Sequence, residues 1–278
     1  MVIKYLTIAF RIVVYIFAAI GFLLVAGYFA VKFGLTNEKG IIDAQREAFL
    51  GQNAAVITAP LPNVPWKQSD EWNVIATALT KDQAVLNQAA ADSGVPARLI
   101  AANLIAEQLR LFFTERETYK QFLYPLKILG SQTQFSWGVM GMKEATAVQV
   151  ETYLKDRTSP FYPGAQYEHL LDFPATTTDM SRARFVRMTD QHNHYWSYLY
   201  AGLYIKEIEA QWRSAGFPID ANVGVLSTLY NIGFQHSNPN PNPQVGGAAI
   251  TAGDTTFSFG GLAADFYDSD LLIDILPK

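Results

Sequence analysis

An uncharged run of twenty residues near the amino terminus constrains the fold of this 278-residue chain more than any other feature. The run extends from Ile12 to Val31 and lies between Arg11 and Lys32. An α-helix needs about twenty predominantly apolar residues to cross the hydrocarbon core of a bilayer. The sequence therefore predicts one transmembrane helix over residues 12–31, with a separately folded domain after it.

A cleaved signal peptide is the alternative interpretation of this run. The apolar core of a signal peptide usually has only about 7 to 15 residues and is followed by a small-residue cleavage site. Here the run is longer and has aromatic residues at its far end, such as Tyr28 and Phe29. The segment before it, residues 1–11, contains Lys4 and Arg11 but no acidic residue, which favours a cytoplasmic location for that end. We therefore expect an uncleaved anchor with the domain outside the cytoplasm.

Three prolines indicate a spacer between the anchor and the domain. Pro60, Pro62 and Pro65 lie within six positions, where they hold the backbone extended and exclude a helix. The predicted organisation is a cytoplasmic amino terminus (1–11), an anchor (12–31), a spacer (32–68), a main domain (69–236) and an extension that packs on it (237–278).

Helix signals dominate the main domain. The capping box from Thr80 to Gln83 predicts a helix that opens there and ends near Gly94, and Pro96 suits the first turn of the helix that follows. Further helices are predicted over residues 143–155, 190–214 and 221–231, and a single hairpin over 248–259. The expected fold class is mainly α, with a small β-hairpin near the carboxyl terminus.

Charge and composition exclude several classes of function. The net charge of −4 and the lack of any run of lysine and arginine argue against a nucleic-acid partner. The chain has no cysteine, and His192 and His194 have no acidic cluster at metal-ligand spacing nearby. No glycine-rich phosphate loop is present either. We therefore expect no metal and no cofactor.

One acidic residue interrupts an apolar helical run in the main domain. Glu107 has Ile100 and Leu104 behind it and Leu111 one turn ahead, so its helical face is largely hydrophobic. Burial disfavours the charged form of a carboxyl group, and an acid that is still protonated near neutrality can donate a proton to a leaving group. Glu107 is therefore a candidate general acid; the alternative is a buried ion pair with Arg110, three residues further on.

Three segments, taken in order, resemble the lysozyme-like lytic transglycosylases. Residues 94–107 are similar to the catalytic helix of that family, in which an acidic residue ends a similar apolar run. Residues 136–142 read Ser-Trp-Gly-Val-Met-Gly-Met and are similar to the family's Ser-x-Gly-x-Met-Gln-apolar segment. Residues 229–233 read Leu-Tyr-Asn-Ile-Gly and resemble its Ala-Tyr-Asn-Ala-Gly. With a softer match at residues 198–205, the resemblance covers about residues 80 to 235.

This resemblance implies a fold, an activity and a set of site residues. The fold would be a lysozyme-like α domain, and the activity would be cleavage of the β-1,4 bond between MurNAc and GlcNAc in peptidoglycan. In that family a single glutamate, here Glu107, acts first as acid and then as base, and the product carries a 1,6-anhydromuramyl end. The residues implied to bind substrate are Gln108, Ser136, Trp137, Gly138, Met140, Tyr230 and Asn231.

The resemblance and the predicted anchor together imply the partners and the location of a cell-wall enzyme. The partners would be peptidoglycan glycan strands, the cytoplasmic membrane and other proteins of the cell envelope. The protein would be a single-pass protein of the bacterial inner membrane, with its domain on the periplasmic or cell-wall side. Aromatic side chains that could stack on sugar rings, or belong to the core instead, are Trp137, Tyr195, Trp196 and Tyr198.

The chain departs from the family pattern at three positions. Gln108 follows the acid where the family usually has serine, Gly141 stands where glutamine is common, and Ile232 replaces a small alanine. Two alternatives stay open, and these departures motivate the second of them. One is a hydrolytic muramidase; the other is a catalytically impaired peptidoglycan-binding or envelope scaffold protein with the same fold.

Overall fold

The computed structural model of the protein describes residues 65–113, 136–190, 192–252 and 254–278, together with five positions between 11 and 21. The chain divides into two compact units, one formed by residues 1–39 with 115–132 and the other by residues 40–114 with 133–278. In the first unit the five described positions are helical. All the elements discussed below belong to the second unit.

The predicted anchor, residues 12–31, lies outside the described residues except for four helical positions. Across the parts of the chain that the structure describes, no helix combines the length and the apolar character needed to cross a bilayer.

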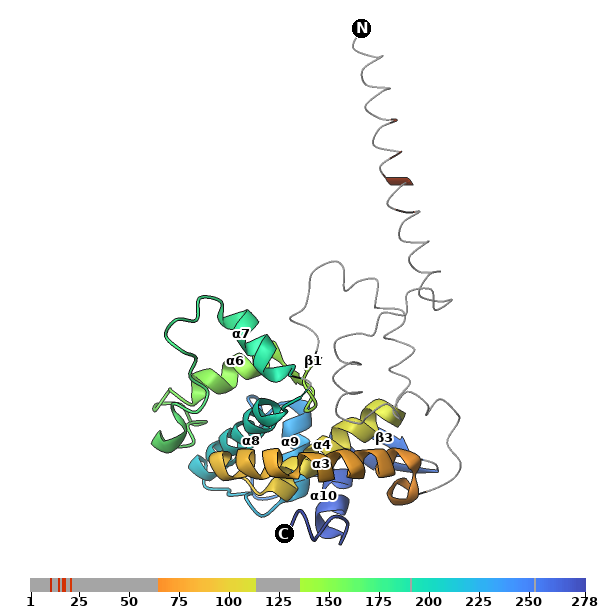
Figure 1. Cartoon of the computed structure of the whole chain (residues 1–278). Coiled ribbons are helices and arrows are strands. Elements are labelled where there is room, and N and C mark those ends of the chain that lie inside the picture. The colour runs from red at the N-terminus through yellow and green to blue at the C-terminus, as the bar shows by residue number, and fades with distance from the viewer. Residues whose placement is uncertain are drawn as a thin grey trace. The chain divides into compact units, whose positions relative to one another are not determined.

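The second unit is mainly helical, as predicted (Figure 1). Its α-helices are α3 (Asp70–Ser93), α4 (Ala97–Phe113), α6 (Glu144–Tyr153), α7 (Met180–Met188), α8 (Tyr195–Ser214), α9 (Val223–Ile232) and α10 (Phe259–Asp268). Two 3-10 helices are described, η2 (Trp66–Gln68) and η5 (Ala165–Tyr167). Two antiparallel hairpins join β1 (Ser136–Trp137) to β2 (Met142–Lys143) and β3 (Ala249–Ala252) to β4 (Thr255–Ser258). The hairpin predicted over 248–259 is confirmed, whereas α7 and α10 were not predicted.

Helix α3 begins ten residues before the predicted start. Ser69 caps it, because its hydroxyl accepts a hydrogen bond from the Trp72 amide at 3.1 Å. Thr80, which was expected to open the helix, lies inside it and donates its hydroxyl hydrogen to the Ala76 carbonyl. The predicted start was therefore wrong, since a stronger cap lies upstream. The helix ends at Gly94 in the left-handed conformation, as expected.

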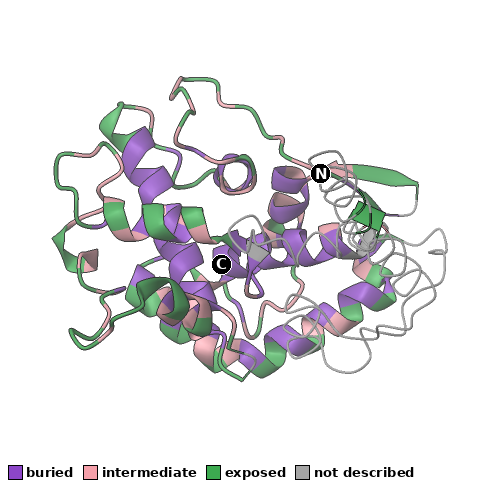
Figure 2. Ribbon diagram, turned by 90° about the horizontal axis from the view of Figure 1, so that it is seen from above, coloured by how far each residue is buried: buried purple, intermediate pink, exposed green. Residues whose placement is uncertain are grey.

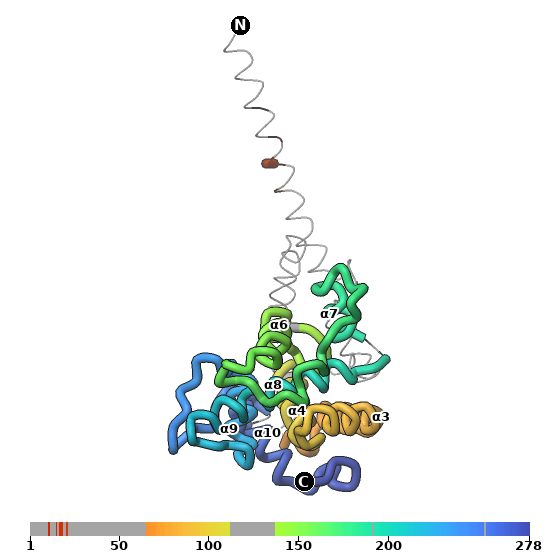
Figure 3. The backbone as a smooth tube through the Cα atoms, turned by 90° about the vertical axis from the view of Figure 1, so that its left-hand side faces the viewer, coloured from red at the N-terminus to blue at the C-terminus, as the bar shows by residue number. Residues whose placement is uncertain are grey.

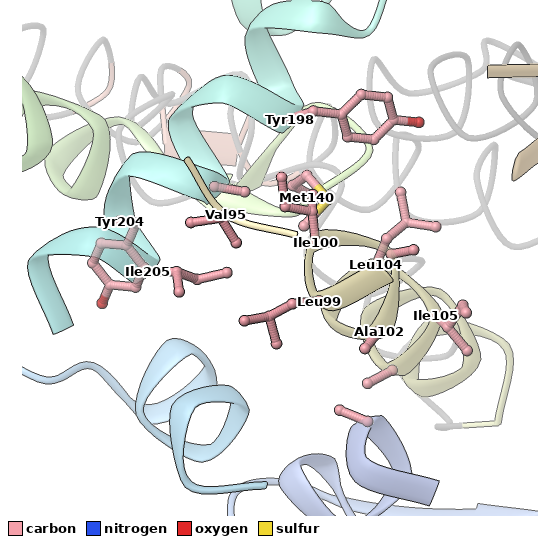
Figure 4. Close-up of a cluster of buried hydrophobic side chains, with 14 of the residues drawn as sticks. Val95, Leu99, Ile100, Ala102, Leu104, Ile105, Met140, Tyr198, Tyr204 and Ile205 are labelled. Atoms are coloured by element: carbon pink, nitrogen blue, oxygen red, sulfur yellow. The ribbon is translucent and has the colours of Figure 1, made fainter. Parts of the chain in front are cut away.

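Helix α4 is the central helix of the unit. Every residue from Leu99 to Leu109 is buried, because α4 packs against α3, α8, α9, α10 and β3. A helix that is apolar on all sides is stable only when other elements surround it. Figure 2 shows buried positions along the interior helices and exposed positions on the outer helices and loops. Figure 4 shows Leu99, Ile100 and Leu104 of α4 within the resulting core.

The carboxyl-terminal extension is built around Arg98. This arginine is fully buried, and its guanidinium donates hydrogen bonds to backbone carbonyls that follow or end α10. The five acceptors are the carbonyls of Phe266, Tyr267, Ser269, Leu271 and Leu276, at 2.5–3.0 Å. Figure 3 shows α10 beside α4 and α9. The extension is thus part of the same core as α4.

The packed unit also begins earlier than the predicted boundary at residue 69. Trp66 is only 1% exposed and its ring meets Trp72 edge to face at 5.4 Å. Its indole nitrogen donates a hydrogen bond to Asp265 of α10 at 3.0 Å, and Lys67 pairs with the same carboxylate at 2.7 Å. The last residues assigned to the spacer are therefore anchored in the folded unit.

Candidate active site

Glu107 lies on α4 with its carboxylate almost fully buried. The residue is 5% exposed, and both carboxylate oxygens accept hydrogen bonds from Arg110. The Nε–Oε2 distance is 3.0 Å and the Nη2–Oε1 distance is 2.6 Å. Such a two-point contact matches the planar guanidinium to an ionised carboxylate. The pairing posed as the alternative for Glu107 is therefore present in the structure.

The turn between β1 and β2 lies directly against this carboxylate. Gly141 has φ of +64°, and a Cβ atom placed on it would lie 2.5 Å from Oε1 and 3.0 Å from Cδ of Glu107. No side chain fits between the turn and the acid. The glycine that departs from the family pattern is thus required by the position of Glu107 in this chain.

Two side chains from different helices hold the same turn. Gln108, next to the acid on α4, donates from Nε2 to the Val139 carbonyl at 2.7 Å. Tyr230, on α9, donates its hydroxyl hydrogen to the Met140 carbonyl at 3.1 Å. The three segments that carry the family resemblance therefore meet at one place, although 123 residues separate Glu107 from Tyr230.

Tyr230 connects α9 to the turn that lies against Glu107. Burial raises the pKa of the Tyr230 hydroxyl well above its usual value, and the negative charge of Glu107 raises it further. The phenol consequently stays protonated and remains a hydrogen-bond donor. Its ring packs edge to face on Tyr204 at 5.5 Å.

Asn231, the neighbour of Tyr230, has a different partner. Its side-chain oxygen accepts a hydrogen bond from the Ala248 amide at 2.8 Å. Thr228, one turn earlier on α9, donates its hydroxyl hydrogen to the Gly224 carbonyl and accepts a hydrogen bond from the Gly246 amide. In this structure the Asn231 side chain holds the backbone just before β3.

Several other residues implied to bind substrate face the protein interior. Trp137 is 4% exposed and packs edge to face on Phe185 at 5.3 Å, and Met140 is 1% exposed. A Cβ atom on Gly138 would overlap Ser197 and the Met188 carbonyl, so this glycine allows close approach of α7 and α8. In the structure these residues pack the β1–β2 turn against the core of the unit. The side chain of Ser136 lies outside the described residues.

The aromatic residues considered for sugar stacking on α8 also have protein partners. Tyr198 is fully buried and donates to Asp82 at 2.7 Å, and Tyr195 donates to Asp92 at 2.7 Å. The Trp196 ring lies 4.2 Å from the Arg187 guanidinium. These contacts are typical of rings that join helices rather than of an open sugar platform.

The chemistry open to this site is that of a single carboxyl group. In the described residues no group of three or more His, Cys, Asp or Glu side chains gathers as a metal site would require. The polar groups that the structure describes around the Glu107 carboxylate are a guanidinium, a phenol and the backbone of the turn. A carboxyl group there could donate a proton or receive one once Arg110 releases it.

A separate cavity of about 660 Å³ lies at the other end of α9. Its lining includes Phe217, Asn222, Asn240, Tyr267 and Asp268, and it contains none of the residues around Glu107. Asn240, Pro241 and Pro243, which precede β3, form one wall of it.

Comparison with known proteins found no match: no family model, no curated protein and no solved structure matches this chain.

Proposed function

We propose that this protein is a membrane-anchored lytic transglycosylase, which cleaves the β-1,4 bond between MurNAc and GlcNAc in peptidoglycan with Glu107 as its only acid and base. The observation that supports it most is the meeting of three resemblance-bearing segments at one carboxylate. Gly141 touches Glu107, and Gln108 and Tyr230 hold the carbonyls of the turn that contains Gly141. A lysozyme-like arrangement of α4, the β1–β2 turn and α9 accounts for that meeting.

The reaction divides into two proton transfers. In the first, neutral Glu107 donates its proton to the glycosidic oxygen, and the bond from that oxygen to C1 of MurNAc breaks. In the second, the Glu107 carboxylate takes the proton of the C6 hydroxyl as that oxygen bonds to C1. The product is a 1,6-anhydro ring, no water is consumed, and the acid returns to its neutral state.

The roles of the neighbours follow from their contacts. Tyr230 and Gln108 fix the backbone of the β1–β2 turn, so that the wall opposite the acid keeps its shape. Buried apolar residues of α4, among them Ile100 and Leu104, lower the polarity behind the carboxyl group.

The test is release of soluble fragments from purified sacculi by the full-length protein, compared with Glu107→Gln. We expect the wild type to release muropeptides with anhydro ends, and the variant to release none above background. Reducing ends in place of anhydro ends would identify a hydrolytic muramidase of the same fold. No release by the wild type under any condition would remove the proposal.

A non-catalytic peptidoglycan-binding or envelope scaffold protein of this fold is the second candidate. The observation that favours it is the Arg110 contact, which keeps both oxygens of Glu107 occupied. This candidate predicts that sacculi bind the protein without being cut, and that Glu107→Gln binds them equally well.

The proposed location follows from the uncharged run. A helix over residues 12–31 would tether the domain to the bacterial inner membrane beside the cell wall, within reach of glycan strands and of other envelope proteins. Fractionation of cells that express the full-length chain, with and without residues 1–31, tests this part independently of activity.

A further inference from the structure

The Arg110 guanidinium is the feature of the site that the proposed reaction leaves unexplained. Its side chain is 17% exposed, against 6% for Glu107, so the cation lies nearer to solvent than the acid it holds. A guanidinium remains charged at every physiological pH, and it stabilises the ionised form of a carboxylate beside it. With both of its oxygens engaged by the guanidinium, Glu107 has neither of them available to a glycosidic oxygen. In the resting site the acid is therefore occupied by its own cation.

Release of Glu107 requires a competing partner for Arg110. Neutral hydroxyl and amide groups of a sugar make hydrogen bonds roughly half as strong as charge-assisted ones. They would not displace a carboxylate from a two-point contact. Another carboxylate would, because it presents the same pair of oxygens to the same fork of donors.

On its other side the carboxylate lies against the β1–β2 turn. A Cβ atom placed on Gly141 would lie 2.5 Å from Oε1 of Glu107, and the Tyr230 hydroxyl is engaged with the Met140 carbonyl. Once the guanidinium turns away, the described residues left around Glu107 are the turn with Gly141 and the apolar residues of α4, and both carboxylate oxygens are released for a substrate.

We propose that Arg110 is a substrate-sensing residue: a carboxylate carried by the glycan near the scissile bond takes the guanidinium from Glu107 and so converts it into a working acid. This rests on the proposed transglycosylase function. In peptidoglycan the nearest such group is the lactyl carboxylate of MurNAc, which is free where the peptide has been removed and forms an amide where it is present. Peptide-free stretches of glycan are therefore cleaved faster than peptide-bearing stretches of the same sacculi, which offer Arg110 only the more distant stem carboxylates.

The test compares cleavage of three substrates by the full-length protein. They are peptide-free strands with free lactyl carboxylates, peptide-bearing strands whose stems supply more distant carboxylates, and neutral chitooligosaccharides. We expect the wild type to cleave peptide-free strands at least about tenfold faster than the neutral oligosaccharides. A preference for peptide-bearing strands would assign the sensing to a stem carboxylate and overturn the assignment to the lactyl group.

The variants are Arg110→Gln, which removes the charge, and Arg110→Lys, which keeps the charge but loses the fork. Arg182→Gln is the matched control, because Arg182 is an exposed arginine on α7. We expect Arg110→Gln to bring the ratio of the two rates close to one through faster cleavage of the neutral oligosaccharide. Arg110→Lys should keep part of the preference, and Arg182→Gln all of it.

The outcomes separate this inference from the function on which it rests. If the wild type cleaves glycan and Arg110→Gln keeps the wild-type ratio, Arg110 senses nothing and the transglycosylase proposal stands. If Arg110→Gln loses cleavage of all three substrates while its thermal unfolding is unchanged, the residue promotes catalysis and the sensing role is wrong. If the wild type cleaves none of them, both proposals fail.

Discussion

Substitution of Gly141 by alanine tests the geometry of the site most sharply. The position has φ of +64°, where a residue with a Cβ atom costs about 1–2 kcal/mol. The new Cβ would also lie 2.5 Å from Oε1 and 3.1 Å from Cγ of Glu107. The carboxylate cannot turn away freely, because Arg110 holds it at two points, so an overpacking cost of about 1–3 kcal/mol adds to the first.

Gly216 supplies the matched control for this substitution. It also has a positive φ, +85°, but a Cβ atom placed on it meets nothing within 4 Å. Gly216→Ala should therefore cost only the conformational part, about 1–2 kcal/mol, while Gly141→Ala should cost about 2–5 kcal/mol. Urea denaturation of the full-length protein, monitored by tryptophan fluorescence, measures both free energies of unfolding.

A double-mutant cycle locates the clash. If the extra cost arises from contact with the acid, Glu107→Ala should relieve part of it, and the two substitutions should couple by about 0.5–3 kcal/mol. Equal losses for Gly141→Ala and Gly216→Ala, with no coupling to position 107, would refute the close approach of the turn to Glu107.

Three further predictions concern charged groups elsewhere in the unit. Arg98→Met should lower the free energy of unfolding by about 3–5 kcal/mol, because five backbone carbonyls lose their buried donor. Limited proteolysis should then cut the chain first after α10. An unchanged urea midpoint would contradict the expected loss of stability. Glu207 is fully buried, neither carboxylate oxygen has a hydrogen-bond partner among the described residues, and burial raises its pKa. The folded state therefore keeps a proton that the unfolded state releases above about pH 4.3, so wild-type stability should fall as pH rises from there. Glu207→Gln should remove that fall in urea titrations at pH 5 and pH 8. Parallel pH profiles of the wild type and the variant would exclude this role of Glu207. Hydrogen bonds from Arg157 and Tyr162 lower the pKa of Glu168 to about 2, so its stabilising contribution is present above the ordinary value of about 4.3 and is lost as pH falls towards 2. Carboxyl NMR should show a Glu168 midpoint near 2 that rises in Arg157→Gln, and a midpoint unmoved by that substitution would disprove the pairing.

The helices that the sequence predicts well are those whose signals are local. Pro96 and the apolar run after it define α4, and the hairpin near residue 253 follows from its turn chemistry. The predicted start of α3 was wrong because two capping patterns compete. The helix begins after Ser69, whose hydroxyl donates to the Trp66 carbonyl and accepts from the Trp72 amide. Local spacing cannot rank two caps when tertiary packing of Trp66 and Trp72 decides between them.

The extension shows what local pattern cannot supply. Helix α10 has only ten residues, and Gly260 and Gly261 lie in its first turn, so its intrinsic propensity is weak. Its stability comes from long-range partners, chiefly Arg98, which lies 168 residues before its first carbonyl acceptor. No feature of the sequence around Arg98 indicates where its donors are directed.

The site was predicted in part for a similar reason. The order of the motifs predicts that Glu107, the β1–β2 turn and Tyr230 lie together. In the structure, Glu107 and Tyr230 both contact that turn. The side chains of this segment were expected to contact substrate, but Trp137 at the end of β1 and Met140 in the turn are both buried in the core. The spacing of Glu107 and Arg110 permits an ion pair, while only the structure shows that both oxygens are engaged.

The most direct test of the central claim is digestion of sacculi in ¹⁸O-labelled water by the full-length protein and by Glu107→Gln, with mass spectrometry of the released fragments. We expect unlabelled 1,6-anhydro products from the wild type, and a rate about 10²–10⁴-fold lower for the variant, the range typical of a lost general acid. Equal release by both proteins, or no release by either, would contradict it.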